Sequence, residues 1–321
     1  MPHALPRCFR RLALSLAIGA FASFAAFAGG TAYVPNEKSS SLSIIDADSA
    51  KAVGEIAVGG KPRGLAVSPD GRTLYVSDQT TNSLVVVDTA AHQVKGRILL
   101  GESPEGVAIS PDGKWVVGAV ELSNSVVFVD TASGEKAFSV RTQGKNPEQA
   151  AFSPDGRWLY VSAEEADSVD VVDVVARKQV ASIKVADRPR GLAFLPDGSK
   201  AYVACELAST VFVIDPATRQ VKSRIKAGTF SNGVAVRPDG GRVYISNGKD
   251  GTVSVIDTAT DTVIATIPVG KRPWGLAVTP DGGRVLVANG RSNSVSVIDT
   301  AKNALLETIP VGEAPWGVAI H

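Results

Sequence analysis

The sequence predicts an all-β protein built from one repeated unit, and three observations support this. The chain of 321 residues contains 31 glycines and 18 prolines but one methionine, a composition that favours many short strands joined by tight turns. The tripeptide Pro-Asp-Gly recurs six times at intervals of 42 or 43 residues. Seven apolar runs each end in an aspartate, at Asp46, Asp88, Asp130, Asp173, Asp215, Asp257 and Asp299.

Each full repeat is interpreted as four strands. In the first, these fall at 64–68, 73–77, 83–87 and 94–100. Four short strands in a period of about 40–45 residues are typical of a β-propeller blade. Pro-Asp-Gly suits the turn between the first two strands, because proline fixes φ and glycine accepts a positive φ. We expect the seven aspartates to accept hydrogen bonds from backbone amides of the next turn; a role for them in binding is the alternative.

The two ends of the chain each begin or stop partway through a repeat. The first β-rich run starts at Ala32, and the last ends with 317–320. If 317–320 is the inner strand of a blade whose other strands come from 31–58, the ring closes and leaves no open sheet edge. A linear solenoid, the alternative, would need capping units, and none is visible. We therefore expect one domain over residues 29–321, a seven-bladed β-propeller with four antiparallel strands per blade.

Residues 1–28 have the three parts of a secretory signal peptide. Residues 1–11 hold three arginines and no acid, 12–27 are apolar or small, and the segment ends in Ala26-Phe27-Ala28. The alternative is an uncleaved membrane anchor, but the stretch is shorter than the ~20 residues of a span. We expect Sec-type cleavage after Ala28 and a periplasmic mature protein without a membrane span.

Charge, cysteine and histidine exclude several classes of protein. Without residues 1–28 the chain carries 30 basic and 32 acidic residues, so no overall field attracts nucleic acid or anionic lipid. The two cysteines, Cys8 and Cys205, form no C-x-x-C motif for haem or zinc. His92 and His321 are too few for a three-histidine metal site. We expect a monomer with no resident cofactor, and we do not expect nucleic acid as its ligand.

The repeats also resemble a known family. The segment Tyr33-Val34-Pro35-Asn36, the recurring Val-Ile-Asp-Thr-Ala of 255–259 and 297–301, and Ser/Thr-Pro-Asp-Gly resemble the YVTN-type β-propeller repeat over nearly all of 31–320. The opening 32–38 and the closing 311–318 are most similar to exported propellers associated with PQQ-dependent alcohol catabolism. This resemblance implies a periplasmic accessory protein of quinoprotein dehydrogenases, and it carries no catalytic residue over to this chain.

Positions that differ between repeats are better candidates for function than the repeated ones. The residue before the small position of each inner strand is expected at the mouth of the central channel. We assign these as candidate ligand-binding residues: Arg63, Glu105, Glu148, Arg190, Asn232, Trp274 and Trp316.

Two interpretations of this set stay open. In the first, the set satisfies itself: Arg63 pairs with Glu105, Arg190 pairs with Glu148, and Trp316 makes a cation–π contact with Arg63. In the second, it forms a small-molecule pocket with an aromatic wall and convergent polar groups.

The loops between second and third strands open on the same face and divide it into halves. One aligned position carries Glu121, Glu164 and Glu206 in three blades, whereas three others carry Asn36-Glu37, Asn247-Gly248 and Asn289-Gly290. An acidic half would suit a basic protein partner, and we assign Glu121, Glu164, Glu206 and Arg272 to partner binding. Cations expected opposite it would take a carboxylate or phosphate: Lys61, Arg188, Lys249, Arg272 and Arg291. The carboxylates would also suit Ca²⁺, although blade spacing separates equivalent side chains.

These features favour an exported, non-catalytic binding or scaffold protein. It would take a small molecule or a periplasmic protein at the channel mouth, as an accessory to quinoprotein alcohol oxidation. Two other classes stay open. One is a Ca²⁺-dependent, lactonase-like hydrolase that uses Glu105 or Glu148; the other binds single-stranded nucleic acid or cell wall by stacking on Trp274 and Trp316. Cys205 lacks the electropositive setting of a nucleophilic thiol, so no catalytic residue is assigned.

Overall fold

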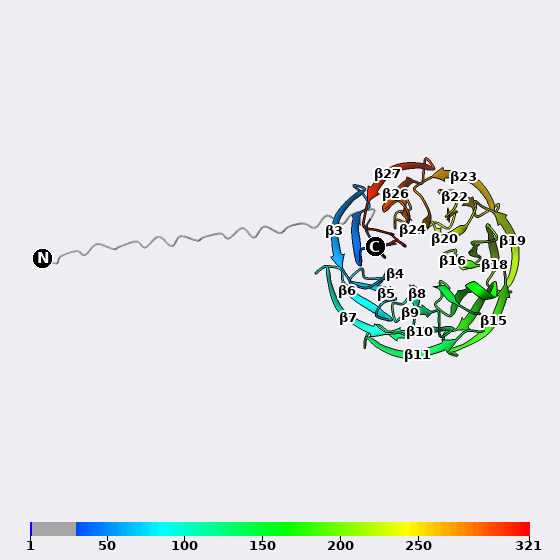
Figure 1. Ribbon diagram of the computed structural model, residues 1–321, viewed down its shortest axis with the longest axis horizontal. Helices are drawn as coiled ribbons and strands as arrows, with labels where there is room; N and C mark the ends of the chain where they lie inside the picture. The colour runs from blue at the N-terminus through cyan, green and yellow to red at the C-terminus, as the bar shows by residue number, and fades with distance from the viewer. Residues whose placement is uncertain (2–29) are drawn as a thin grey trace.

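The computed structural model describes Met1 and residues 30–321, which form seven four-stranded antiparallel sheets around a central channel (Figure 1). The predicted fold class is confirmed. The predicted export signal lies, apart from Met1, outside the described residues. Within the described part of the chain, no helix is long and apolar enough to cross a membrane.

Blades 1 to 6 follow one another along the chain, each with its inner strand first. Blade 1 consists of β4 (Pro62–Val67), β5 (Thr73–Asp78), β6 (Ser83–Asp88) and β7 (Gln93–Leu99). Blade 2 consists of β8 (Pro104–Ile109), β9 (Trp115–Val120), β10 (Ser125–Asp130) and β11 (Glu135–Arg141). Blade 3 consists of β12 (Pro147–Phe152), β13 (Trp158–Ala163), β14 (Ser168–Asp173) and β15 (Lys178–Lys184). Blade 4 consists of β16 (Pro189–Phe194), β17 (Ala201–Cys205), β18 (Thr210–Asp215) and β19 (Gln220–Lys226). Blade 5 consists of β20 (Ser231–Val236), β21 (Arg242–Asn247), β22 (Thr252–Asp257) and β23 (Thr262–Pro268). Blade 6 consists of β24 (Pro273–Val278), β25 (Arg284–Asn289), β26 (Ser294–Asp299) and β27 (Ala304–Pro310). The closing blade is β28 (Ala319–Ile320), β1 (Thr31–Asn36), β2 (Ser41–Asp46) and β3 (Lys51–Ala57).

The ring closes through the two ends of the described chain, as the sequence predicts. Strand β28 pairs antiparallel with β1, and Ala32 lies opposite Ile320. The backbone amide of Thr31 donates to the carbonyl of His321 at 2.7 Å, and the amide of Trp316 donates to the carbonyl of Pro35 at 2.9 Å. The regular strand, Ala319–Ile320, is shorter than the expected 317–320, and an isolated bridge between Pro315 and Asn36 continues the contact with β1.

The core lies between neighbouring blades. The two middle strands of a blade are buried on both faces, so they are nearly continuous apolar runs, such as β17 with all five residues buried. One cluster combines Tyr202 and Val211 of blade 4 with Val243 and Ile245 of blade 5. Because each blade packs against the next in this way, the ring needs no second layer.

The repeated aspartates belong to the scaffold, as expected. Each of the seven accepts a hydrogen bond from a backbone amide two or three residues later. At Asp257, the amides of Ala259 and Thr260 both donate to Oδ1 at 3.0 Å. These hydrogen bonds, led by the one from Thr260, lower the pKa of Asp257. The aspartates therefore fix the outer turns and lie outside the channel mouth.

A β-bulge at the start of the inner strands aims side chains into the channel. In β4, Pro62 pairs with Asp78 and Leu65 with Val76, so β4 holds one extra residue between these pairs. Similar register shifts occur in the inner strands of blades 2 to 6. A bulge breaks the alternation of side chains, which frees the residue after the strand's first position, Arg63 in blade 1, to face the channel.

The glycine that follows the bulged residue is required by close approach of the next blade. A Cβ on Gly64 would overlap the carbonyl oxygen of Glu105, and one on Gly233 would lie 2.5 Å from the carbonyl oxygen of Trp274. The inner strands therefore pack backbone to backbone. Blade 3 carries Gln149 at this position.

Candidate functional site: the channel mouth

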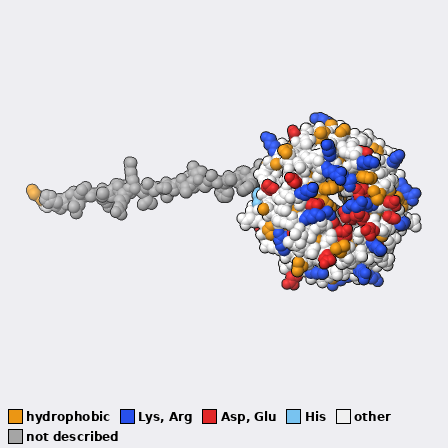
Figure 2. All heavy atoms as spheres, in the orientation of Figure 1, with side chains coloured by type: hydrophobic (Ala, Val, Ile, Leu, Met, Phe, Trp, Pro, Cys, Tyr) orange, Lys and Arg blue, Asp and Glu red, His pale blue; other side chains and the backbone are white. Residues whose placement is uncertain are grey.

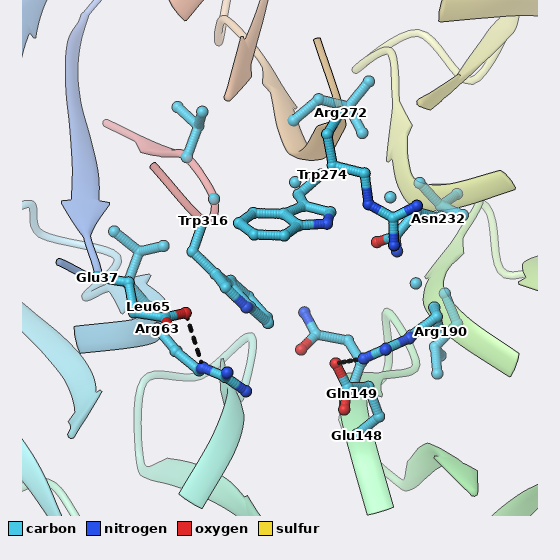
Figure 3. Close-up of a pocket in the computed structure, with 18 residues that line it drawn as sticks. Glu37, Arg63, Leu65, Glu148, Gln149, Arg190, Asn232, Arg272, Trp274 and Trp316 are labelled. Atoms are coloured by element: carbon cyan, nitrogen blue, oxygen red, sulfur yellow. Dashed lines mark hydrogen bonds and ion pairs between the residues drawn. The ribbon is translucent and has the colours of Figure 1, made fainter. Parts of the chain in front are cut away.

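The mouth of the channel encloses a cavity of about 200 Å³ (Figure 3). Six of the seven predicted ligand-binding residues line it, and the seventh, Glu105, is buried against Arg63 instead. The structure adds Glu37, Gln149 and Arg272 to the lining. Apolar side chains of the inner strands complete the wall: Leu65, Leu192, Val234, Leu276 and Val318.

Arg190 joins three carboxylates from blades 3 and 4. Its Nη1 donates to Glu148 and lies 3.2 Å from Glu164 Oε2, and its Nε lies 3.1 Å from Glu206 Oε2. Only 17% of the Arg190 side chain is exposed. Burial raises the pKa of Glu148 to about 8, against the opposing effect of Arg190. Glu148 therefore keeps its proton near neutral pH, while Arg190 stays charged.

Arg63 makes the corresponding contacts between the closing blade and blades 1 and 2. Its Nε lies 3.1 Å from Glu37 Oε2, and its Nη1 lies 2.5 Å from Glu105 Oε1. Glu105 is 2% exposed, and burial raises its pKa although Arg63 opposes the shift. Both predicted pairings, Arg63–Glu105 and Arg190–Glu148, are confirmed, and near neutral pH the second is a hydrogen bond from the guanidinium to a carboxyl group that keeps its proton. The predicted cation–π contact of Trp316 with Arg63 is not found among the described residues, because the guanidinium is turned toward Glu37 and Glu105.

Arg272 reaches from blade 6 across blade 5 to Glu206 of blade 4. Its Nη2 lies 2.5 Å from Glu206 Oε1, and Arg188 lies 3.4 Å from the other oxygen of this carboxylate, which is 1% exposed. A Cβ on Gly248 would lie 3.1 Å from Arg272 Nη1. Arg272 passes over Gly248, so a larger side chain such as the glutamate of blades 2 to 4 would not fit at this position.

Trp274 and Trp316 form the opposite wall, and Figure 3 shows both indoles directed into the cavity. A Cβ on Gly290 would overlap the ring of Trp274, so glycine at this position makes room for the indole. The backbone of both residues is fixed: the Ser246 hydroxyl donates to the Trp274 carbonyl, and the Gly275 amide donates to the Trp316 carbonyl at 3.0 Å.

The asparagines of the same loops are structural. Asn247 Nδ2 donates to the hydroxyls of Thr252 and Ser254, and its Oδ1 accepts from the Gly228 amide at 3.1 Å. Asn36 and Asn289 donate in the same way. At the next position, Gly248 and Gly290 make room for Arg272 and Trp274, whereas the closing blade carries Glu37 there, which binds Arg63.

The residues assigned to partner binding are largely engaged within the ring. Glu164 and Glu206 are held by arginines, and Glu121 accepts a hydrogen bond from the Ser103 hydroxyl at 2.7 Å. The expectation that cations stand opposite the acidic half is wrong for Arg188 and Arg272, which pair with these carboxylates directly. Figure 2 shows the resulting mixture of acidic and basic side chains around the central opening.

Two further candidate chemistries depend on particular side chains. Among the described residues, no three His, Cys, Asp or Glu side chains are grouped so as to hold a metal ion. Cys205 is fully buried, and burial raises the pKa of its thiol to about 12. A thiol with that pKa is not a nucleophile near neutral pH.

Comparison with protein families identifies the chain. A model described as a YNCE-like β-propeller matches residues 10–110 and 107–240. The chain belongs to the YNCE-like β-propeller family. A second model, described as a lactonase with a seven-bladed β-propeller, matches residues 175–311. The predicted resemblance to a propeller family is thus confirmed at the level of seven-bladed families, and the association with PQQ-dependent alcohol catabolism stays a prediction.

This member of the YNCE-like family is also similar to solved structures. Hydrazine synthase of Kuenenia stuttgartiensis is 26% identical, with a TM-score of 0.77 over 89% of this chain and 99% of that chain. A functionally unknown protein from Desulfotomaculum acetoxidans DSM 771 is 16% identical (TM-score 0.80, 91% and 98% covered). The dihydro-heme d1 dehydrogenase NirN, in complex with DHE, is 17% identical (TM-score 0.68, 92% and 76% covered). The last two likenesses show the fold alone, and comparison with curated proteins gave no match.

Proposed function

We propose that this propeller is a non-catalytic binding protein whose channel mouth takes a small molecule with a flat apolar body and an anionic end. The observation that carries the proposal is the cavity that Trp274 and Trp316 share with three guanidinium groups. Its volume of about 200 Å³ suits a ligand of about one aromatic ring, since a cavity of about 150 Å³ accepts benzene.

The free donors of the cavity favour an anionic group. In the described part of the chain, Arg63 and Arg190 bind carboxylates through Nε and Nη1, and Nη2 of each has no acceptor. Arg272 engages Glu206 through Nη2 alone. Charge-assisted bonds from guanidinium to carboxylate are among the strong hydrogen bonds of proteins.

The protonation of Glu148 also bears on the charge of the lining. Glu148 keeps its proton near neutral pH, because its pKa is raised to about 8. Of the charged groups that line the cavity, Arg63, Arg190 and Arg272 then stand with the single carboxylate of Glu37, while Glu105, Glu164 and Glu206 bind these arginines without lining the cavity. The surrounding charge is therefore nearly balanced, and an incoming carboxylate would gain from direct hydrogen bonds to the guanidinium groups that face the cavity.

The tryptophan wall accounts for the apolar body of the ligand. Aromatic pairs contribute about 0.5–1.5 kcal/mol beyond area burial. The indoles stand on fixed backbone with room made by Gly290, so little ordering is needed when a ligand enters.

The test compares benzoate and phenylacetate with benzyl alcohol and benzaldehyde, which have a similar ring and no charge. We expect the carboxylates to quench tryptophan fluorescence and raise the melting temperature, since a ligand at 100 times its Kd adds about 2.7 kcal/mol. The neutral compounds should bind at least tenfold more weakly. Equal binding of both groups removes the anionic part of the proposal, and the absence of any binding at 10 mM removes the pocket.

The setting of this activity is part of the proposal. The basic and apolar residues of 1–28 support export to the periplasm, and the sequence resemblance supports a role accessory to quinoprotein alcohol oxidation. Such oxidation converts alcohols into aldehydes and acids, and a carboxylate site suits the acids. Mass spectrometry of the protein from a periplasmic extract should find an N-terminus at Gly29; an intact N-terminus contradicts export by cleavage.

A lactonase-like hydrolase is the second candidate, favoured by the match of the lactonase model to residues 175–311. In this case Glu148 would first have to lose its proton and could then act as a base on water, with Ca²⁺ supplied from solution. A panel of lactones, with Ca²⁺ or with EDTA, separates the two functions. Turnover that EDTA and Glu148→Gln both abolish would replace the binding proposal.

A further inference from the structure

We propose that a basic groove between blades 5 and 6, outside the channel mouth, docks an acidic peptide segment of a partner protein. The groove has a volume of about 730 Å³ and is more open to solvent than the central cavity. Its walls are the loops 248–251 and 268–272, together with Phe230 and Arg291. This proposal is independent of small-molecule binding, since Arg272 alone lines both spaces.

The groove concentrates positive charge that the ring does not neutralise. Lys249, Lys271 and Arg291 are exposed, and none of them forms an ion pair among the described residues. By contrast, Arg63, Arg188 and Arg190 on the same face are each paired with two or more carboxylates. Figure 2 shows Lys and Arg side chains on the part of this face that blades 5 and 6 occupy in Figure 1.

The one acid of the groove is already engaged. Asp250 Oδ2 accepts a hydrogen bond from the backbone amide of Thr229 at 2.6 Å. Its charge reduces the potential of the groove without closing an ion pair with Lys249 or Lys271. Carboxylates from outside the chain are therefore the complementary partners for these cations.

Phe230 gives the groove an apolar contact. It stands where most blades have the residue before a proline, and its φ of 60° is similar to that of the equivalent Arg188 and Arg272. Its ring is half-buried and belongs to none of the interblade core clusters of the described chain. Lys249 Nζ lies 5.6 Å and Arg272 Cζ 5.4 Å from the ring centroid.

These contacts specify the kind of peptide. An apolar side chain would pack on Phe230 beside Pro268 and Val269, and carboxylates on either side of it would reach the cations. A nucleic-acid strand fits less well, because its regularly spaced phosphates would continue past the groove onto a face that also carries the glutamates of blades 2 to 4. A short acidic segment has negative charge only where the groove is positive.

The test uses a fluorescein-labelled dodecapeptide of glutamate with one central leucine, at 20 mM and 150 mM salt. We expect saturable binding by anisotropy that weakens at the higher salt, because the contacts are exposed charges. The double variant K249E/K271E should bind at least tenfold more weakly. The matched control is K38E/K145E, which reverses two exposed lysines of the same face that also lack an ion pair in the described chain.

A third variant tests the apolar contact. Phe230→Ala should lower the affinity for the leucine peptide several-fold and leave an all-glutamate peptide unchanged. The proposal is overturned if the wild type does not bind the peptide at 20 mM salt, or if K38E/K145E weakens it as much as K249E/K271E. It is also overturned if a twelve-nucleotide thymidine strand binds more tightly and loses affinity in the same variant. Benzoate binding, measured in parallel, reports on the channel mouth separately.

Discussion

The two halves of the channel mouth share one backbone and differ in what fills it. In blades 1 to 4 the bulged positions hold arginine and glutamate, which pair across blades. In blades 5 and 6 and the closing blade they hold Asn232, Trp274 and Trp316, which line the cavity, and glycines nearby make room for Arg272 and the Trp274 indole. The charged half therefore links neighbouring blades through ion pairs and hydrogen bonds, and the tryptophan half supplies the wall of the cavity.

The comparison teaches that a ring of equivalent positions need not have one role. The charged half buries carboxylates whose removal from water is costly unless each stays paired or protonated. The tryptophan half has no such constraint, so substitutions there should affect binding more than stability. Four predictions test this division.

The largest loss of stability is expected for Arg190→Ala. It leaves Glu206 and Glu164 near one another with less compensation, and loss of one partner of a buried pair costs about 3–5 kcal/mol. Urea unfolding at pH 7 measures this loss. Lys184→Ala, which removes an exposed partner of Asp167, is the control and should cost less than about 1 kcal/mol. Equal losses of unfolding free energy for the two variants would show that the charged half does not stabilise the contact between blades.

The second prediction concerns pH. The folded pKa of Glu148 is about 8, above the ordinary value of a glutamate, so between about pH 5 and 8 the folded state keeps a proton that the unfolded state has released. The free energy of unfolding should therefore fall as pH rises through this window and level off above it. Glu148→Gln should remove this fall, which for a pKa of about 8 against the ordinary value of 4.5 is on the order of 5 kcal/mol. Parallel pH profiles for the two proteins contradict the assignment.

The third prediction concerns the tryptophan half of the channel mouth. Trp316→Ala should weaken aromatic carboxylate binding about tenfold, or about 1.4 kcal/mol, with a change in unfolding free energy below about 1 kcal/mol. Calorimetric titration and urea unfolding measure the two quantities. Trp158→Ala, in β13 and outside the cavity lining, is the control and should lower stability without changing affinity. A Trp316→Ala protein that binds normally would move the site elsewhere.

The smallest effect is expected for Lys61→Met. Lys61 is 40% exposed and lies 3.4 Å from Glu37 Oε1, and exposed pairs contribute about 0–1 kcal/mol. The free energy of unfolding, obtained from thermal unfolding, should fall by no more than this amount. A larger loss of unfolding free energy would show that exposed ion pairs also stabilise the charged half. A loss within this range would show that its stability depends on the buried guanidinium groups.

Much of the mouth was accessible from the sequence because the repeats align. Counting from Pro-Asp-Gly placed seven side chains at one level of the ring, and six line the cavity. The pairs Arg63–Glu105 and Arg190–Glu148 followed from adjacency of blades. Contacts that skip a blade had no such signal: Arg272 meets Glu206 across blade 5, and its only trace in the sequence is the glycine at position 248.

The sequence by itself determined the number of blades, the strand order and the closure by both ends, because these depend on a period of 42 or 43 residues and on alternation that is local to each repeat. Only the tertiary structure decided which charges remain available. Whether Glu206 meets solvent or three arginines, and whether Lys249 meets a carboxylate or none, depends on side-chain reach and burial across blades. Those quantities arise from packing in three dimensions, where residues far apart in the chain compete for the same partner.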